Sequence, residues 1–213
     1  KILCITFTQK ATEVMKSRLE NLGISEATVS TFHSFCKEVC SENFMTSGLS
    51  DSSKLMKETS LAVWCLKNFD TFGIDYKIIG TGDGLSRDVK GMVQALSNFK
   101  ESLITSDQFQ KWLNEQEKQF AKFTPKEIRA NKELIKYVTL HKEFNKVYAA
   151  YEKFQQDKGI FDFDDMVLKA VTLLREESDI LEEYQKKYDY ILVDEFQDNN
   201  FSQFELVRML GGH

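Results

Sequence analysis

Apolar and polar residues alternate at both ends of the chain in a way that predicts strands and helices in turn. Residues 2–7 are almost continuously apolar, which indicates a strand, and residues 9–22 repeat apolar side chains at helical spacing. A second strand is predicted at residues 27–30, and Thr31 is a good N-cap for the helix that follows. This succession is typical of an α/β domain.

The middle of the chain has a different pattern. Residues 43–144 are mostly helical by periodicity, and the chain contains a single proline, Pro125, which favours a helix-rich protein. Strand and helix patterns then return. We therefore expect an α/β domain made of residues 1–42 and 145–213, interrupted by a helical insertion at residues 43–144.

The last predicted strand ends in carboxylates. Residues 190–193 are uninterruptedly apolar, which predicts a parallel strand covered on both faces, and Asp194 and Glu195 follow directly. Ligand sites in open parallel sheets lie at the carboxyl ends of the strands, where an acidic pair can hold Mg²⁺ and orient a water molecule. An acidic turn without catalytic function fits the same residues, and these residues alone leave both interpretations open.

Two further segments join a predicted strand to a helix. Residues 6–11 and 28–35 offer hydroxyls, an amide and helix N-terminal N–H groups, which suit a phosphate backbone, and Phe7 can stack on a base. The alternative is an ordinary capped helix with Phe7 in the core. In the second segment, His33 is either a donor to nucleic acid or a structural histidine.

A zinc site is a further alternative for the second segment. His33, Cys36 and Cys40 recur at helical spacing, but a fourth ligand and the usual paired-cysteine spacing are missing. The chain has four cysteines in all, too few for a disulfide scaffold, which suits a reducing cytoplasm.

Charge and hydropathy limit the classes of partner. The net charge is −5, which argues against general affinity for nucleic acid, although residues 100–146 carry 10 basic and 7 acidic groups. That segment is either a local basic face or a solvated mixed-charge surface. There is no apolar stretch as long as a membrane span and no signal-peptide pattern, so no membrane partner is expected.

Several catalytic motifs do not occur in the sequence. The glycines at positions 80, 82 and 84 lack the last glycine of a dinucleotide loop, and the G-x-x-x-x-G-K-[ST] phosphate loop (Walker A) is absent from residues 1–213. The serine elbow and the H-E-x-x-H zinc motif are absent as well, so esterase and protease chemistry have no support.

Four segments, in this order, resemble the UvrD/Rep/PcrA family of superfamily-one DNA helicases. Residues 5–11 with 15–19 are similar to motif Ia, residues 31–35 to motif Ib, and residues 193–200 with Gln203 to motif II, the Walker B motif. Residues 162–166 are similar to a segment that these enzymes carry shortly before motif II. Two departures are mild: Gln9 stands where the family often has Asn, and Asn199 where Thr is usual.

The resemblance implies a fold and a nucleotide site. The α/β part would be a partial P-loop, RecA-like motor domain (1A), and the insertion its 1B subdomain. In the full protein the cofactors would be ATP and Mg²⁺. Asp194 would hold the Mg²⁺ through water. Glu195 would also lie at the metal and would activate the attacking water. Gln197 would couple the nucleotide state to DNA contacts.

The resemblance also implies a function, that of an ATP-dependent 3′–5′ DNA helicase of repair or recombination that acts on single-stranded and duplex DNA. The expected DNA-binding residues are Phe7, Thr8, Gln9, Lys10, Thr31, Phe32, His33 and Ser34. Because the phosphate loop and the second motor domain would lie outside residues 1–213, we expect a piece of a longer protein that is inactive alone. A RecB/AddA-like helicase–nuclease subunit and a non-catalytic DNA-binding module remain alternatives.

Overall fold

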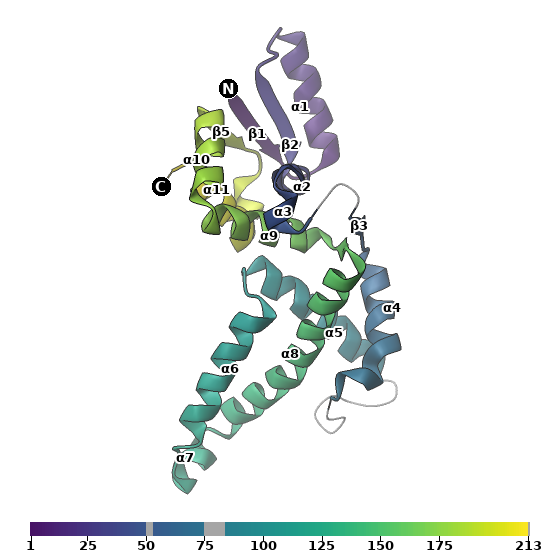
Figure 1. The fold of residues 1–213 in the computed structure, drawn as a ribbon, viewed down its shortest axis with the longest axis vertical. Coiled ribbons are helices and arrows are strands. Elements are labelled where there is room, and N and C mark those ends of the chain that lie inside the picture. The colour runs from purple at the N-terminus through teal and green to yellow at the C-terminus, as the bar shows by residue number, and fades with distance from the viewer. Residues whose placement is uncertain (50–52, 75–83, 213) are drawn as a thin grey trace. The chain divides into compact units, whose positions relative to one another are not determined.

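The computed structural model describes residues 1–49, 53–74 and 84–212, which form two compact units (Figure 1). Unit 1 consists of Lys1–Leu55, Lys100–Leu103 and Phe161–His213, and unit 2 of Met56–Phe99 and Ile104–Ile160.

These boundaries differ from the divisions expected after residues 42 and 144. Helix α8 runs without a break from Lys132 to Lys158 and ends at Gly159, whose φ of +59° closes it in the left-handed conformation that favours glycine. Position 145 therefore lies inside a helix. At the other boundary, the short helix α3 (Phe44–Ser47) belongs to unit 1.

Unit 1 is built on a small parallel sheet. Its strands are β1 (Ile2–Thr6), β2 (Ala27–Thr31) and β5 (Tyr190–Val193), in the order β2-β1-β5. The three strands were predicted from the apolar pattern and are confirmed. Both pairings are parallel, so the carboxyl ends of all three strands lie at one edge of the sheet.

The remaining elements of unit 1 are mainly helices. They are α1 (Gln9–Asn21), α2 (Phe32–Glu42), α3, α9 (Phe163–Glu176), α10 (Ser178–Lys187), α11 (Phe201–Leu210) and the short 3-10 helix η2 (Phe196–Asp198). Two short strands, β3 (Lys54–Leu55) and β4 (Ile160–Phe161), pair with each other. The predicted cap of α2 is confirmed, because the Thr31 hydroxyl accepts a hydrogen bond from the Ser34 backbone N–H at 3.2 Å.

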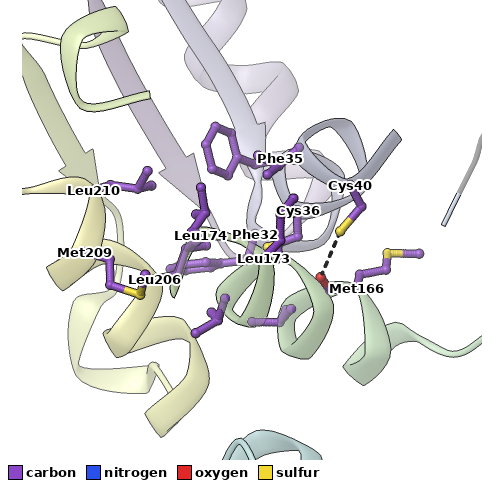
Figure 2. Close-up of a cluster of buried hydrophobic side chains, with 14 of the residues drawn as sticks. Phe32, Phe35, Cys36, Cys40, Met166, Leu173, Leu174, Leu206, Met209 and Leu210 are labelled. Atoms are coloured by element: carbon purple, nitrogen blue, oxygen red, sulfur yellow. Dashed lines mark hydrogen bonds between the residues drawn. The ribbon is translucent and has the colours of Figure 1, made fainter. Parts of the chain in front are cut away.

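One face of the sheet carries the main core of unit 1. Leu3 and Ile5 of β1 are fully buried there against side chains of α2, α9 and α11. Figure 2 shows part of this cluster, with Phe32, Phe35, Cys36 and Cys40 from α2, Met166, Leu173 and Leu174 from α9, and Leu206, Met209 and Leu210 from α11. Each large side chain buried in this way stabilises the fold by about 1.5–3 kcal/mol.

The opposite face of the sheet is only partly covered. Helix α1 packs against β1 and β2, where the hydroxyls of Thr6 and Thr12 meet at 2.6 Å. On β5, Tyr190 and Leu192 are 68% and 57% exposed. The expectation that this apolar strand is covered on both faces is therefore wrong for the described chain, because β5 is an edge strand and α1 packs against the other two strands.

Unit 2 is helical throughout its longer elements. It contains α4 (Glu58–Asn68), the 3-10 helix η1 (Phe69–Phe72), most of α5 (Gly84–Glu101), α6 (Ser106–Phe120), α7 (Pro125–Ala130) and α8. Its core is rich in aromatic rings, with Tyr148 and Tyr151 fully buried. The glycine-rich segment at residues 80–83 lies outside the described residues. Among the helices that are described, none combines the length and the apolar character needed to cross a membrane.

Candidate nucleic-acid interface and acidic strand end

Two strand-to-helix turns lie next to each other at the carboxyl edge of the sheet. The first connects β1 to α1, and its Thr8 hydroxyl accepts a hydrogen bond from the Ala11 N–H at 3.1 Å. The second connects β2 to α2 through the Thr31 cap. Because β1 and β2 are paired in parallel register, with Thr6 opposite Thr31, the two helix starts are neighbours.

A pocket of about 210 Å³ opens between these turns and the start of α9. It is lined by Phe7, Gln9, Thr31, His33, Ser34, Lys37, Phe163 and Met166. Side chains from three separate parts of the sequence therefore converge on one cavity. Five of the eight were predicted as DNA-binding residues.

Hydrogen bonds link the polar wall of this pocket. The Gln9 side-chain amide donates to the Ser34 hydroxyl oxygen at 3.2 Å, and the Thr31 hydroxyl donates to the same oxygen at 2.9 Å. Ser34 therefore joins the turn after β1 to the turn after β2. The amide and hydroxyl groups are of the kinds that commonly contact the phosphates and sugars of nucleic acids.

Aromatic rings form the other wall. Phe7 and Phe163 are 46% and 49% exposed, which decides against the alternative that Phe7 belongs to the core. The ring of Phe163 meets His33 edge-on, with 5.4 Å between the ring centres. Burial lowers the pKa of His33, an effect that the nearby Asp164 carboxylate partly opposes. A histidine whose pKa is lowered in this way is neutral at pH 7, so its ring offers one donor and one acceptor.

Three predicted DNA-binding residues do not line the pocket. Thr8 and Lys10 are exposed on the nearby start of α1. Phe32 requires a correction, because its side chain is 2% exposed and packs in the core. The apolar face of α2 begins at Phe32, so its position next to His33 in the sequence does not bring it to the surface.

The sequence prediction also missed three lining residues. Lys37 lies one turn after His33 on α2, and that spacing is a signal that was available in the sequence. Phe163 and Met166 lie in the segment that resembles the family upstream of motif II. The residues around them indicated a capped helix but did not show which side chains would reach the turns after β1 and β2.

The cysteines of α2 face the core, away from this pocket. Cys36 and Cys40 are fully buried, and the Cys40 thiol approaches the Met166 carbonyl oxygen at 3.9 Å (Figure 2). Burial raises the pKa of both thiols, that of Cys40 to about 12. A buried, protonated thiol is a poor metal ligand, so the zinc alternative gains no support from these residues.

The acidic segment begins where β5 ends. The Asp194 N–H donates to the Ile5 carbonyl at 2.9 Å and so continues the sheet pairing by one residue. Glu195 follows with a φ of +50°, a conformation that is uncommon for residues other than glycine, and Asp194, Glu195 and Gln197 are all exposed. The Gln197 amide donates to a Glu195 carboxylate oxygen at 2.5 Å.

This segment does not form a metal cage. Within the described ranges, no group of three or more His, Cys, Asp or Glu side chains could together hold a metal ion. Magnesium usually takes one or two protein carboxylates and completes its shell with water and substrate phosphates. The two exposed carboxylates of Asp194 and Glu195 therefore fit a metal shared with a nucleotide.

Comparison with known proteins identifies the family. The family model described as UvrD/REP helicase N-terminal domain matches residues 1–213. The chain is 29% identical over 212 residues to the ATP-dependent DNA helicase PcrA of Staphylococcus epidermidis, covering 98% of this chain and 25% of that protein. It is 29% identical over 219 residues to the ATP-dependent DNA helicase Rep of Salmonella typhimurium, covering 99% and 27%.

A probable DNA helicase II homolog of Mycoplasma pneumoniae is 30% identical over 222 residues, covering all of this chain and 27% of that protein. The chain thus spans about a quarter of the length of the curated relatives it matches. The order of motifs, the parallel sheet and the whole-length match agree. The chain belongs to the UvrD/REP helicase N-terminal domain family.

Proposed function

We propose that this chain is part of an ATP-dependent DNA helicase and that its pocket holds a single DNA strand. The family match and the names of the relatives support an ATP-dependent enzyme that acts on DNA. The 3′–5′ direction, a role in repair or recombination and a cytoplasmic location are part of the proposal and come from the resemblance to the family and from the free cysteines.

The pocket is the observation that carries the proposal. Its exposed rings, Phe7 and Phe163, are suited to stacking on bases, which is tolerant of sequence because every base has an aromatic face. Its polar wall of Gln9, Thr31 and Ser34 can donate to and accept from a sugar-phosphate backbone. Lys37 adds a positive charge at the same cavity.

We further propose that unit 1 is part of a RecA-like motor domain, 1A, and that unit 2 is its 1B subdomain. A parallel sheet with functional side chains at its carboxyl edge supports the first assignment. The second is supported by the helical content of unit 2 and by its place in the sequence, between the two long segments of unit 1.

The end of β5 would supply the protein side of the nucleotide site. Bound with ATP, Mg²⁺ neutralises phosphate charge during phosphoryl transfer. Asp194 would bind the ion through a water molecule, and the adjacent Glu195 would take a proton from the attacking water. The 2.5 Å hydrogen bond from Gln197 to Glu195 supports a role for this amide in orienting the base.

Substitution of Phe7 tests the proposed strand site. In the full-length protein, Phe7→Ala should weaken binding of a fluorescent oligothymidylate about tenfold, because stacking on one base contributes roughly 1–3 kcal/mol. Phe44→Ala is the matched control, since Phe44 is 51% exposed in unit 1 and lies outside the pocket. Equal affinity for wild type and Phe7→Ala would show that the pocket is not part of the site that binds the DNA strand.

A further inference from the structure

A buried ion triad lies at the start of helix α9, of which Phe163 and Met166 line the pocket. The Lys100 side chain is 1% exposed, and its ammonium is 2.6 Å from a carboxylate oxygen of Asp162 and 2.6 Å from one of Asp165. Lysine is rarely buried so completely unless it is paired. All three residues belong to unit 1.

The two aspartates also cap helix α9. The second oxygen of Asp162 accepts the Asp165 N–H at 2.9 Å, and the second oxygen of Asp165 accepts the Asp162 N–H at 2.8 Å. Each carboxylate therefore gives one oxygen to the helix backbone and one to Lys100. The capping box satisfies the helix start, and the lysine compensates the charge that the box buries.

The capped turn carries the aromatic wall of the pocket. Phe163 is the first residue of α9, directly after the Asp162 cap, and Met166 follows one turn later. Both line the pocket, and Phe163 meets His33 there. The position of the Phe163 ring thus depends on the same turn that Lys100 holds.

We propose that Lys100 is a positioning residue of the strand-binding pocket, which acts on the DNA through Phe163. Lys100 itself does not line the cavity. Its ammonium holds the carboxylates of the capping box, and the box fixes the turn that presents Phe163. This inference rests on the proposed strand-binding function of the pocket.

The electrostatics of the triad agree with this role. Burial opposes ionisation of Asp162, but the Lys100 ammonium and the hydrogen bonds from Lys100 and Asp165 together outweigh it and lower the pKa of that carboxyl group. Burial raises the pKa of Asp165 to about 6 despite the same ammonium. The pair of aspartates therefore relies on Lys100 to remain ionised at neutral pH, and loss of the lysine would remove the cation that contacts both carboxyl groups.

A double-mutant cycle in the full-length protein tests the proposal. Lys100→Met alone can fail to fold, because it strands two buried carboxylates, so the main variant is Lys100→Met/Asp162→Asn/Asp165→Asn. The triple variant buries no charge at the triad, and it lacks the contacts by which Lys100 holds both side chains of the capping box. Oligothymidylate binding is measured for wild type, Phe163→Ala, the triple variant and the combination of both.

We expect Phe163→Ala to weaken binding about tenfold in the wild-type background and less than twofold in the folded triple variant. An equal loss in both backgrounds would overturn the role of Lys100, since a merely structural triad leaves the effect of Phe163 unchanged. Lys90→Met, at an exposed lysine of the same helix, is the control and should leave the tenfold loss intact.

Two further outcomes are informative. If the triple variant does not fold, Asp165→Asn alone, which keeps the Lys100–Asp162 contact, should reduce the effect of Phe163→Ala by at least half, and an unchanged effect overturns the proposal. If neither Phe163→Ala nor Phe7→Ala affects binding in the wild-type background, it is the proposed function that fails.

Discussion

The pocket at the ends of β1 and β2 and the acidic segment at the end of β5 lie at the same edge of one sheet but are organised differently. In the pocket, Ser34 is hydrogen-bonded to both Gln9 and Thr31, and Phe163 is packed against His33. At the acidic end, the side chains of Asp194, Glu195 and Gln197 are exposed, and Glu195 is hydrogen-bonded to Gln197, two residues away.

Asn199 makes the contrast sharper. Both polar atoms of its side-chain amide are shielded from solvent and have no hydrogen-bond partner within the described part of the chain. Buried polar groups are normally paired, so the unpaired amide of Asn199 distinguishes the acidic segment from the pocket. The two regions therefore differ in how their polar side chains are partnered within the described residues.

The largest expected effect separates the two regions by chemistry. Glu195→Gln in the full-length protein should slow ATP turnover by a factor on the order of 10²–10⁴, because it removes the proposed general base, while oligothymidylate affinity stays within about twofold. Steady-state ATPase assays and fluorescence anisotropy measure the two quantities. Glu183→Gln, at an exposed carboxylate of α10, is the control. Turnover near the wild-type rate would show that Glu195 is not the base.

The second expected effect separates binding from folding within the pocket region. Phe32→Ala should lower the free energy of unfolding by about 3–5 kcal/mol, because it empties a fully packed site in the core. Phe7→Ala should change it by no more than about 0.5 kcal/mol, since Phe7 is half exposed. Denaturant unfolding followed by circular dichroism measures both. Similar losses for the two variants would contradict the division between core and pocket.

The smallest expected effect concerns charge at the pocket. If about two lysines contact phosphates, oligothymidylate affinity should fall about sevenfold between roughly 50 and 200 mM salt, since each contact adds about 0.7 to the slope of log affinity against log salt. Lys37→Gln should reduce that slope by about 0.7. Lys16→Gln, on the exposed side of α1, should leave the slope unchanged. An oligothymidylate affinity that does not change with salt concentration would argue against contacts to the DNA phosphates.

Much of unit 1 could be predicted because its signals are local. The Thr31 cap follows from the residue type directly before the predicted helix, and it is confirmed. Helix α1 was less predictable. It was predicted from apolar side chains at helical spacing in residues 9–22, but two of these, Val14 and Leu22, are exposed, whereas the polar Thr12 is buried and meets the Thr6 hydroxyl of β1.

The features that local pattern could not provide are those set by distant contacts. Lys100 looks like any other lysine of a mixed-charge helix, and its burial depends on two aspartates more than 60 residues away. Phe163 follows its capping residue in the sequence, and only the arrangement of α2 beside α9 shows that it shares a cavity with His33. The exposure of Tyr190 and Leu192 on β5 likewise depends on which elements pack on the sheet.

The uncovered strand β5 has a consequence for work with this stretch of protein on its own. In the described residues, β5 is paired along one side only, and Tyr190 and Leu192 add an apolar surface to its free edge. Such an edge is a template for pairing with another chain. Self-association of the isolated 213-residue polypeptide would compete with ligand binding. Its affinity for DNA should therefore be measured at low protein concentration, where self-association contributes least.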